Sequence, residues 1–218
     1  RVDTIDAMSG TPTLDALLQY DAVLTWSDAA YGDSAALGSL LADYVDQDRG
    51  VVQSIFRSYP EPGAHLEGRW ASGGYRSFSD GPSTSGSGLM LVPQDAGHPI
   101  LSGIPDFAGN DDSYYSIPAS LDAATTLVAS WSDGAPFITT GAGPSGGRIV
   151  GLNLFPAPRD IPLIANALLF AATAIAANQP PTADAGADQT LEATSSTGAS
   201  FMLNGSGTDP DGDPLTFT

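Results

Sequence analysis

The most sharply patterned chemical motif is a run of carboxylates near the C-terminal end of the sequence. Asp209, Asp211 and Asp213 alternate with a proline and a glycine. Carboxylates spaced in this way around a glycine turn suit a hard cation such as Ca²⁺, which prefers oxygen ligands. The motif lacks the later glutamate and the flanking helices of an EF-hand. A tight turn in which the same side chains accept hydrogen bonds from backbone amides is an equally open interpretation. Calcium is the only cofactor that the sequence suggests.

A second set of candidate residues follows the predicted strands and continues into a long glycine-rich loop. Open α/β sheets bind ligands at the carboxyl ends of their parallel strands. Aromatic rings together with Arg, Asp and Asn side chains can stack on, and hydrogen-bond to, a sugar or another small polar ligand. The alternative is that the rings are buried and the arginines pair with aspartates. The candidate ligand-binding residues are Trp26, Asp28, Arg57, Arg69, Trp70, Tyr75 and Asn153.

A catalytic nucleophile is harder to find. The sequence has no Cys, which excludes a thiol nucleophile, a disulfide scaffold and a zinc site built on thiolates. Ser58 could replace a thiol, with His65 or His98 as the base. However, no G-x-S-x-G motif surrounds Ser58, and Pro60 disfavours a turn that continues into a helix. We therefore assign no catalytic residue, and a hydrolase acting on glycans or amides through an unusual serine is kept as an alternative.

The charge balance limits the possible partners. Seven Arg, no Lys and 25 acidic residues give a net charge of −18. Such a surface repels nucleic acids and anionic membranes. The apolar segment 161–177 is shorter than the ~20 residues that a membrane span needs, and it has Asp160 before it and Pro162 in its first turn. We interpret it as a helix packed on a sheet, and we expect neither a nucleic-acid partner nor a membrane span.

The elements that must position these residues are clearest between Tyr20 and Phe56. The apolar run 22–26 predicts a buried strand, and apolar residues at helical spacing, capped by Asp33 or Ser34 and ended by Gly50, predict a helix. The run 51–56 predicts a second strand. A crossover of this length requires two parallel strands, joined in the right-handed sense.

Similar patterns extend the prediction over the first 177 residues. We expect a short strand at 2–5, a helix that begins at Thr11–Thr13, and a strand at 89–92. A hairpin around Ser132-Asp133-Gly134, a strand at 148–155 and a helix at 160–177 follow. Together these elements predict an α/β domain with a mainly parallel sheet and helices on both faces.

The composition changes abruptly at Asn178. Residues 178–181 (NQPP) read as a stiff linker, and residues 182–218 show short strand-like pieces at 189–193, 200–203 and 215–218 between Pro, Gly and Asp turns. The predicted organisation is an α/β domain over 1–177, a linker over 178–181 and part of a β-sandwich over 182–218.

Two resemblances sharpen these expectations. The motifs VDTIDAMSGTPTLDALLQYDAVLTW, LADYVDQDRGVV, GHPIL and GRIVGLNLFP resemble the class I glutamine amidotransferase-like fold that is also seen in ThuA-type proteins. This resemblance implies a flavodoxin-like sheet whose first strand would precede Val2, and a nucleophilic Cys where Arg57-Ser58-Tyr59-Pro60 stands instead. NQPPTADAGADQT and GSGTDPDGDPLTFT resemble the start of a PKD-like immunoglobulin-type domain, which implies a secreted or cell-surface protein.

The combined expectation is a non-catalytic, secreted or cell-surface module that binds a glycan or surface ligand, or that serves in adhesion. The partial sandwich predicted at the end of the chain leaves unpaired strand edges. Either the chain is a fragment of a longer protein, or neighbouring copies supply the missing strands. The second case would make the protein a homo-oligomeric subunit of an extracellular filament or layer.

Overall fold

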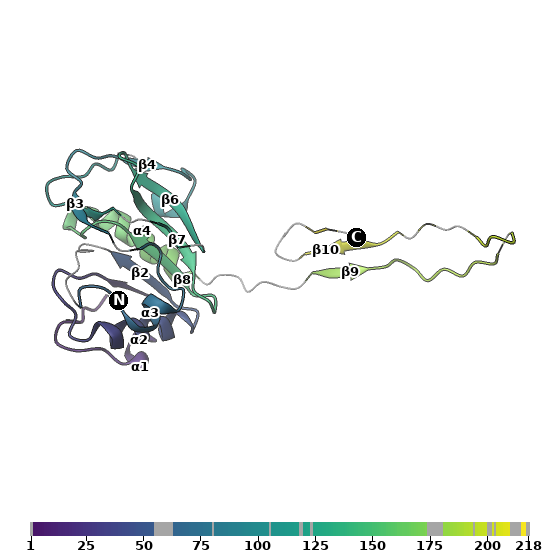
Figure 1. Ribbon diagram of the computed structural model, residues 1–218, viewed down its shortest axis with the longest axis horizontal. Helices are drawn as coiled ribbons and strands as arrows, with labels where there is room; N and C mark the ends of the chain where they lie inside the picture. The colour runs from purple at the N-terminus through teal and green to yellow at the C-terminus, as the bar shows by residue number, and fades with distance from the viewer. Residues whose placement is uncertain are drawn as a thin grey trace. The chain divides into compact units, whose positions relative to one another are not determined.

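The computed structural model describes residues 2–54, 63–79, 81–104, 106–117, 120–122, 124–173, 181–193, 195–199, 202, 204–209 and 215–216. The chain divides into two compact units, Arg1–Ile175 and Ala176–Thr218 (Figure 1).

The first unit is built on a six-stranded sheet with the order β1-β2-β8-β7-β6-β4. β1, β2 and β8 are parallel neighbours, whereas β7, β6 and β4 pair in antiparallel fashion. Since β7 is antiparallel to β8, and β6 to β7, β6 runs in the same direction as β1, β2 and β8. The strands are β1 (Ala22–Thr25), β2 (Gly50–Ser54), β4 (Leu91–Pro93), β6 (Thr125–Trp131), β7 (Pro136–Ala142) and β8 (Arg148–Leu152).

Helices cover both faces of this sheet. In the central strands, Val51 and Ile149 join the cluster that contains the apolar residues of α2 (Ser34–Val45). Their neighbours Val52 and Val150 join the cluster that contains the apolar residues of α4 (Ile161–Ala172). Alternate residues of a strand point to opposite faces, so strands buried on both sides are apolar throughout. The predicted flavodoxin-like α/β fold class is confirmed.

β1 and β2 are parallel and are joined through α2, as predicted, but the helix ends elsewhere than expected. The side chain of Asp33 accepts a hydrogen bond from the backbone N–H of Ala36 at 2.9 Å and so caps α2. The helix ends at Val45 with Asp46 as its C-cap, not at Gly50. Gly50 instead begins β2, where a Cβ atom would lie 2.2 Å from the carbonyl oxygen of Ala171. This glycine is needed for close approach to α4, not for ending α2.

The remaining elements of the first unit are short. They are α1 (Leu14–Leu17), α3 (Gly68–Ser72), the 3₁₀ turns η1 (Pro99–Leu101) and η2 (Pro158–Asp160), and an antiparallel pair formed by β3 (Ser83–Ser85) and β5 (Tyr114–Ser116). In Figure 1, α1, α2 and α3 gather near β2, whereas β4 and β6 lie at the other end of the unit. No helix in the described ranges is long and apolar enough to cross a membrane.

Two predicted strand segments are wrong. Residues 2–5 form no strand, and the side chain of Val2 is 90% exposed. Their alternation has no structural effect because no neighbouring strand pairs with them. In the second unit, residues 189–193 also form no strand, and β9 (Thr182–Asp184) pairs antiparallel with β10 (Ser206–Thr208) instead. The predicted strands at 200–203 and 215–218 lie largely outside the described residues.

Gly38 provides a test of how tightly α2 packs. Replacing a helical Gly by Ala ordinarily stabilises a helix by about 1 kcal/mol. Here a Cβ atom at Gly38 would lie 2.1 Å from the carbonyl oxygen of Glu67, so steric overlap outweighs helix propensity. We expect Gly38→Ala to lower the free energy of unfolding by about 2 kcal/mol, measured by denaturant titration. Gly10→Ala, which adds a Cβ atom in open space, is the control and should change stability by less than about 0.5 kcal/mol.

Candidate functional site

A hollow of about 340 Å³ lies at the carboxyl edge of the parallel strands. Asp28 reaches it from the segment after β1, and Phe155 reaches it from the segment after β8. Because β1, β2 and β8 run in the same direction, these segments leave the sheet at the same edge. This is the edge at which open α/β sheets bind ligands. The hollow is lined by Asp28, Asp112, Tyr114, Phe155, Pro156, Ala157 and Pro158.

The side chain of Asn153 holds one wall of this hollow in place. Its Nδ2 donates to the carbonyl oxygens of Ser116 and Pro136, both at 2.7 Å, and its Oδ1 accepts from the N–H of Ser116 at 2.7 Å. The N–H of Phe155 donates to the carbonyl oxygen of Tyr114 at 3.0 Å. These bonds attach β5 to the segment that follows β8, so Tyr114 is fixed at the rim.

Arg159 holds the same wall from the other side. Its guanidinium donates to the Ser113 hydroxyl and, at 3.3 Å, to the carbonyl oxygen of Ala108. Ser113 lies between the lining residues Asp112 and Tyr114. Arg159 therefore ties the loop that carries both of them to the turn before α4.

Asp160 follows the lining residues 155–158 and is almost completely buried, with 1% of its surface exposed. Its Oδ2 accepts a hydrogen bond from the N–H of Ala157 at 2.9 Å, and its Oδ1 lies 3.4 Å from Nε of Arg159. Burial raises the pKa of the Asp160 carboxyl, and the Ala157 N–H and the Arg159 charge oppose that rise. The group supports the turn 157–160 from inside.

The surface of the hollow is aromatic and acidic. Tyr114 is 42% exposed, and Trp26, which lies two residues before Asp28, is 44% exposed. The carboxylates of Asp28 and Asp112 are exposed as well. None of the described lining residues is basic. Such a surface offers ring faces for stacking and hydrogen-bond acceptors for hydroxyl or ammonium groups.

Of the predicted ligand-binding residues, Trp26 and Asp28 lie exposed at this edge, whereas Trp70, Tyr75 and Asn153 are buried. Nε1 of Trp70 donates to Oε1 of Gln53 at 3.1 Å, and its ring stacks on that of Tyr75 with the centroids 5.9 Å apart. In this structure these three side chains make framework contacts. Their role in ligand binding stays a prediction.

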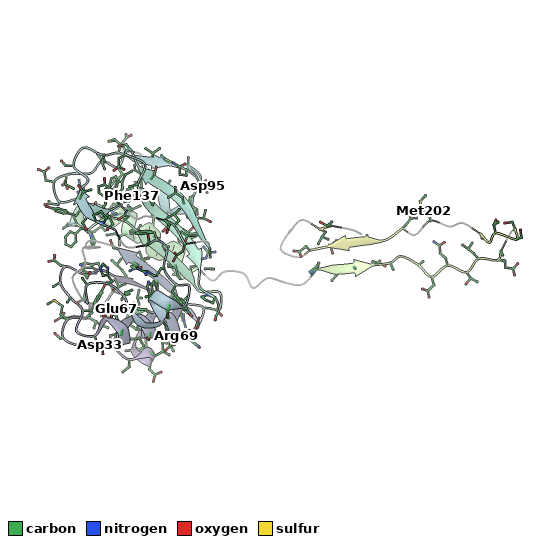
Figure 2. The ribbon with its side chains drawn as sticks, viewed as in Figure 1. Asp33, Glu67, Arg69, Asp95, Phe137 and Met202 are labelled. Atoms are coloured by element: carbon green, nitrogen blue, oxygen red, sulfur yellow. The ribbon has the colours of Figure 1, made fainter. Side chains whose placement is uncertain are left out.

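Arg69 lies in α3, where it is tied to the end of α2 (Figure 2). It forms ion pairs with Asp43 and Asp46, and it donates to the Tyr75 hydroxyl at 2.7 Å. That hydroxyl donates in turn to Asp46 at 2.7 Å. Burial acts to raise the pKa of the Asp46 carboxyl, but the hydrogen bonds from Arg69 and Tyr75 together outweigh it, so this pKa is lowered. Burial, assisted by Asp46, raises the pKa of Tyr75 to about 12. Arg69 thus pairs with aspartates, as the alternative interpretation of the sequence anticipated.

Several predicted residues lie outside the described ranges, namely Arg57, Ser58, Asp211 and Asp213. Asp209 follows β10 and is half-buried. Among the described residues, no group of three or more His, Asp or Glu side chains could hold a metal ion. The calcium site therefore stays a prediction.

His98 has a framework role. Its Nδ1 accepts a hydrogen bond from the N–H of Ile100 at 3.3 Å, and its ring centroid lies 4.6 Å from that of Phe170. Burial lowers the pKa of its imidazole. These contacts make His98 a hydrogen-bonded residue of the turn that opens η1, and its role as a base stays a prediction.

The sequence prediction missed Asp112 and Tyr114. They lie in the segment 110–115 (NDDSYY), where acidic and aromatic residues adjoin without helical or strand periodicity. The coincidence of polar and aromatic residues was a usable signal. The sequence does not show to which edge of the sheet this segment attaches, because the hydrogen bonds of the Asn153 side chain set that position.

Removing the Asn153 amide tests the proposed anchoring. Asn153→Ala removes the three hydrogen bonds that this side chain makes to the backbone of Ser116 and Pro136, and the loss of hydrogen bonds to buried backbone groups is costly inside a protein. We expect the free energy of unfolding to fall by about 2–4 kcal/mol, measured by denaturant titration. Asn110→Ala, at a more exposed loop position, should cost under about 1 kcal/mol. Equal losses in the two variants would show that Asn153 is not a special anchor.

Comparison with known proteins gives a fold-level likeness. No family model matches the chain, and no curated protein matches it. A cytoplasmic protein from Salmonella typhimurium, STM3548, is similar in structure with a TM-score of 0.57 and 17% sequence identity, over 76% of this chain and 77% of that one. A putative ThuA-like protein from Bacteroides uniformis aligns with a TM-score of 0.47 and 13% identity, over 71% and 70% of the two chains. The first of these shows that the chain shares its fold with the Salmonella protein.

Proposed function

We propose that the chain is a non-catalytic binding module whose ligand is a glycan, held at the carboxyl edge of the sheet. The observation that carries this proposal is the hollow itself, in which the exposed ring of Tyr114 adjoins the carboxylates of Asp28 and Asp112. Aromatic faces stack on the C–H surfaces of sugar rings, and carboxylates accept hydrogen bonds from sugar hydroxyls. Trp26 adds a second exposed ring at the same edge of the sheet.

The exposure of the two carboxylates favours binding over hydrolysis. A pair of carboxyl groups in one hollow is also the equipment of a glycosidase. Its general acid must stay protonated near neutral pH, which enzymes achieve by burying the group against apolar side chains. Asp28 and Asp112 are both exposed, and the buried carboxyl nearby, Asp160, accepts from the backbone of the turn that it supports. Hydrolysis through Asp28 and Asp112 is therefore the second candidate.

For the second unit we propose a PKD-like β-sandwich and a secreted or cell-surface setting. The sequence resemblance over 178–218 and the antiparallel pairing of β9 with β10 support the sandwich. The described residues of β9 and β10 are largely exposed, and a two-stranded ladder of this kind gains stability when further strands pair with it. Strand addition from neighbouring copies, which would build a filament or layer, is the corresponding alternative.

Calcium binding at Asp209, Asp211 and Asp213 is part of this proposal. A ligand that binds only the folded state stabilises it by mass action. We expect the second unit to melt at a higher temperature in calcium than in a chelator, by calorimetry of the whole chain. The rise should be lost in Asp211→Ala and kept in Glu192→Ala, which removes an exposed carboxylate elsewhere in the same unit. A rise that survives Asp211→Ala would place the ion elsewhere.

Substitution of Tyr114 tests the binding site. Loss of one aromatic stacking platform in an exposed site costs about 1–2 kcal/mol, so Tyr114→Ala should weaken glycan binding about tenfold. The measurement is calorimetric titration with ligands found by screening a panel of soluble oligosaccharides. Met90→Ala is a matched control, since Met90 is 41% exposed but lies beside β4 and does not line the hollow. Binding that is equally strong in both variants would refute the site.

A further inference from the structure

We propose that the glycan bound in this hollow carries protonated amines, as polymers of unacetylated amino sugars do. The inference rests on the proposed function and adds a charge selectivity to it. The same Asp28 and Asp112 that accept hydrogen bonds from hydroxyl groups then act as the residues that determine specificity.

The charges around the hollow provide the first argument. Asp28 and Asp112 place two formal negative charges in a lining whose described residues include no Lys or Arg. An anionic sugar would meet like charges here, and a neutral sugar would use only the acceptor capacity of the carboxylates. An ammonium group satisfies both the charge and the acceptors, since it has three donors and no acceptor.

Arg159, the cation that follows the lining residue Pro158, pairs with Asp160 and not with either of these carboxylates, since its Nε lies 3.4 Å from Oδ1 of Asp160. The guanidinium of Arg159 donates to Ser113 and Ala108, and it lies 5.8 Å from the centroid of the Phe107 ring. Arg159 follows the lining residue Pro158 but does not itself line the hollow. It positions the wall and leaves the exposed carboxylates to face solvent.

The helix that follows the lining residues 155–158 could have opposed a cation. α4 begins at Ile161, and the N-terminal end of a helix carries partial positive charge. The carboxyl of Asp160 is buried at this end and accepts from the N–H of Ala157. A carboxyl at this position opposes the helix dipole locally, so the dipole does not exclude a cation from the hollow.

The exposed aromatic rings also favour a sugar that carries a positive charge. The face of an aromatic ring attracts a cation as well as the C–H surface of a sugar. Tyr114 and Trp26 are therefore compatible with a sugar whose substituent is an ammonium group. The net charge of −18 adds long-range attraction, which raises the local concentration of a polycation and falls as salt is added.

The test compares oligomers of equal length on the complete chain by calorimetric titration, at low and at physiological salt. The probes are oligomers of glucosamine, of N-acetylglucosamine and of galacturonic acid, which carry positive, zero and negative charge. We expect glucosamine oligomers to bind about tenfold more tightly than the acetylated ones. The ratio of the two affinities should fall as the salt concentration rises. Galacturonic acid oligomers should bind most weakly.

The variants locate the selectivity. Asp28→Asn and Asp112→Asn should each reduce the affinity for glucosamine oligomers about fivefold. The affinity of each variant for the acetylated oligomers should stay within about twofold of that of the unsubstituted chain. Asp106→Asn is the matched control, because it removes the same charge from an exposed position outside the lining. It should change neither affinity by more than about twofold.

The outcomes separate this inference from the proposed function. Equal binding of the acetylated and unacetylated oligomers, unaffected by either Asp variant, would overturn the charge selectivity and leave the glycan site standing. Failure of every oligomer to bind would overturn both. Oligolysine of the same charge is the last probe. If it binds as tightly as glucosamine oligomers, and Tyr114→Ala leaves its binding unchanged, general attraction to the acidic surface explains the result and the sugar selectivity is refuted.

Discussion

Three hydrogen bonds from one buried amide hold the wall of the candidate site. The side chain of Asn153 accepts from one backbone group and donates to two others, in segments that lie far from it in sequence. An amide is suited to this work because it is both donor and acceptor, and a carboxylate or an apolar side chain would leave buried backbone groups unpaired. Tyr114 lies exposed at the rim because the buried Asn153, just after β8, anchors the neighbouring Ser116.

Throughout the first unit, buried side chains hold the framework, and polar side chains reach solvent where the strands end. The central strands present alternate residues to two separate apolar clusters, one including α2 and one including α4. Packing on both faces leaves the ends of the strands as the places where polar side chains can reach solvent. The polar and aromatic residues that remain exposed beside Asp28 therefore owe their accessibility to the layered core.

The local features of this fold were largely predictable, and the long-range ones were not. The cap at Asp33, the hairpin turn at Ser132-Asp133-Gly134 and the buried strands around Val51 and Ile149 follow from short-range patterns, and each forms. The residues 2–5 alternate equally well but meet no partner strand. An alternating pattern shows that a segment is suited to be a strand, whereas strand pairing depends on whether another strand lies beside that segment.

The candidate site shows the same difference between local and long-range features. Trp26 and Asp28 were identifiable because they directly follow a strand whose direction could be predicted. The burial of Trp70 and Tyr75 could not be predicted, because aromatic residues in a glycine-rich segment carry no sign of burial. In the structure Trp70, which belongs to α3, and Tyr75 pack in the same apolar cluster as residues of α2. Tyr114 could not be assigned to the carboxyl edge, since its position depends on a hydrogen-bonded contact with the segment after β8.

The described arginines share a feature that reaches beyond the site. Arg49 pairs with Asp21 at 2.7 Å, Arg69 pairs with Asp43 and Asp46, and Arg148 lies 4.3 Å from the centroid of the Phe170 ring. Arg159 and Arg76 also interact within the chain. Because these five arginines make contacts within their own chain, the described part of the molecule offers neighbouring copies few positive groups to meet their acidic surfaces. The like net charge of every copy is a repulsive contribution to any contact between copies, and it weakens as counter-ions accumulate.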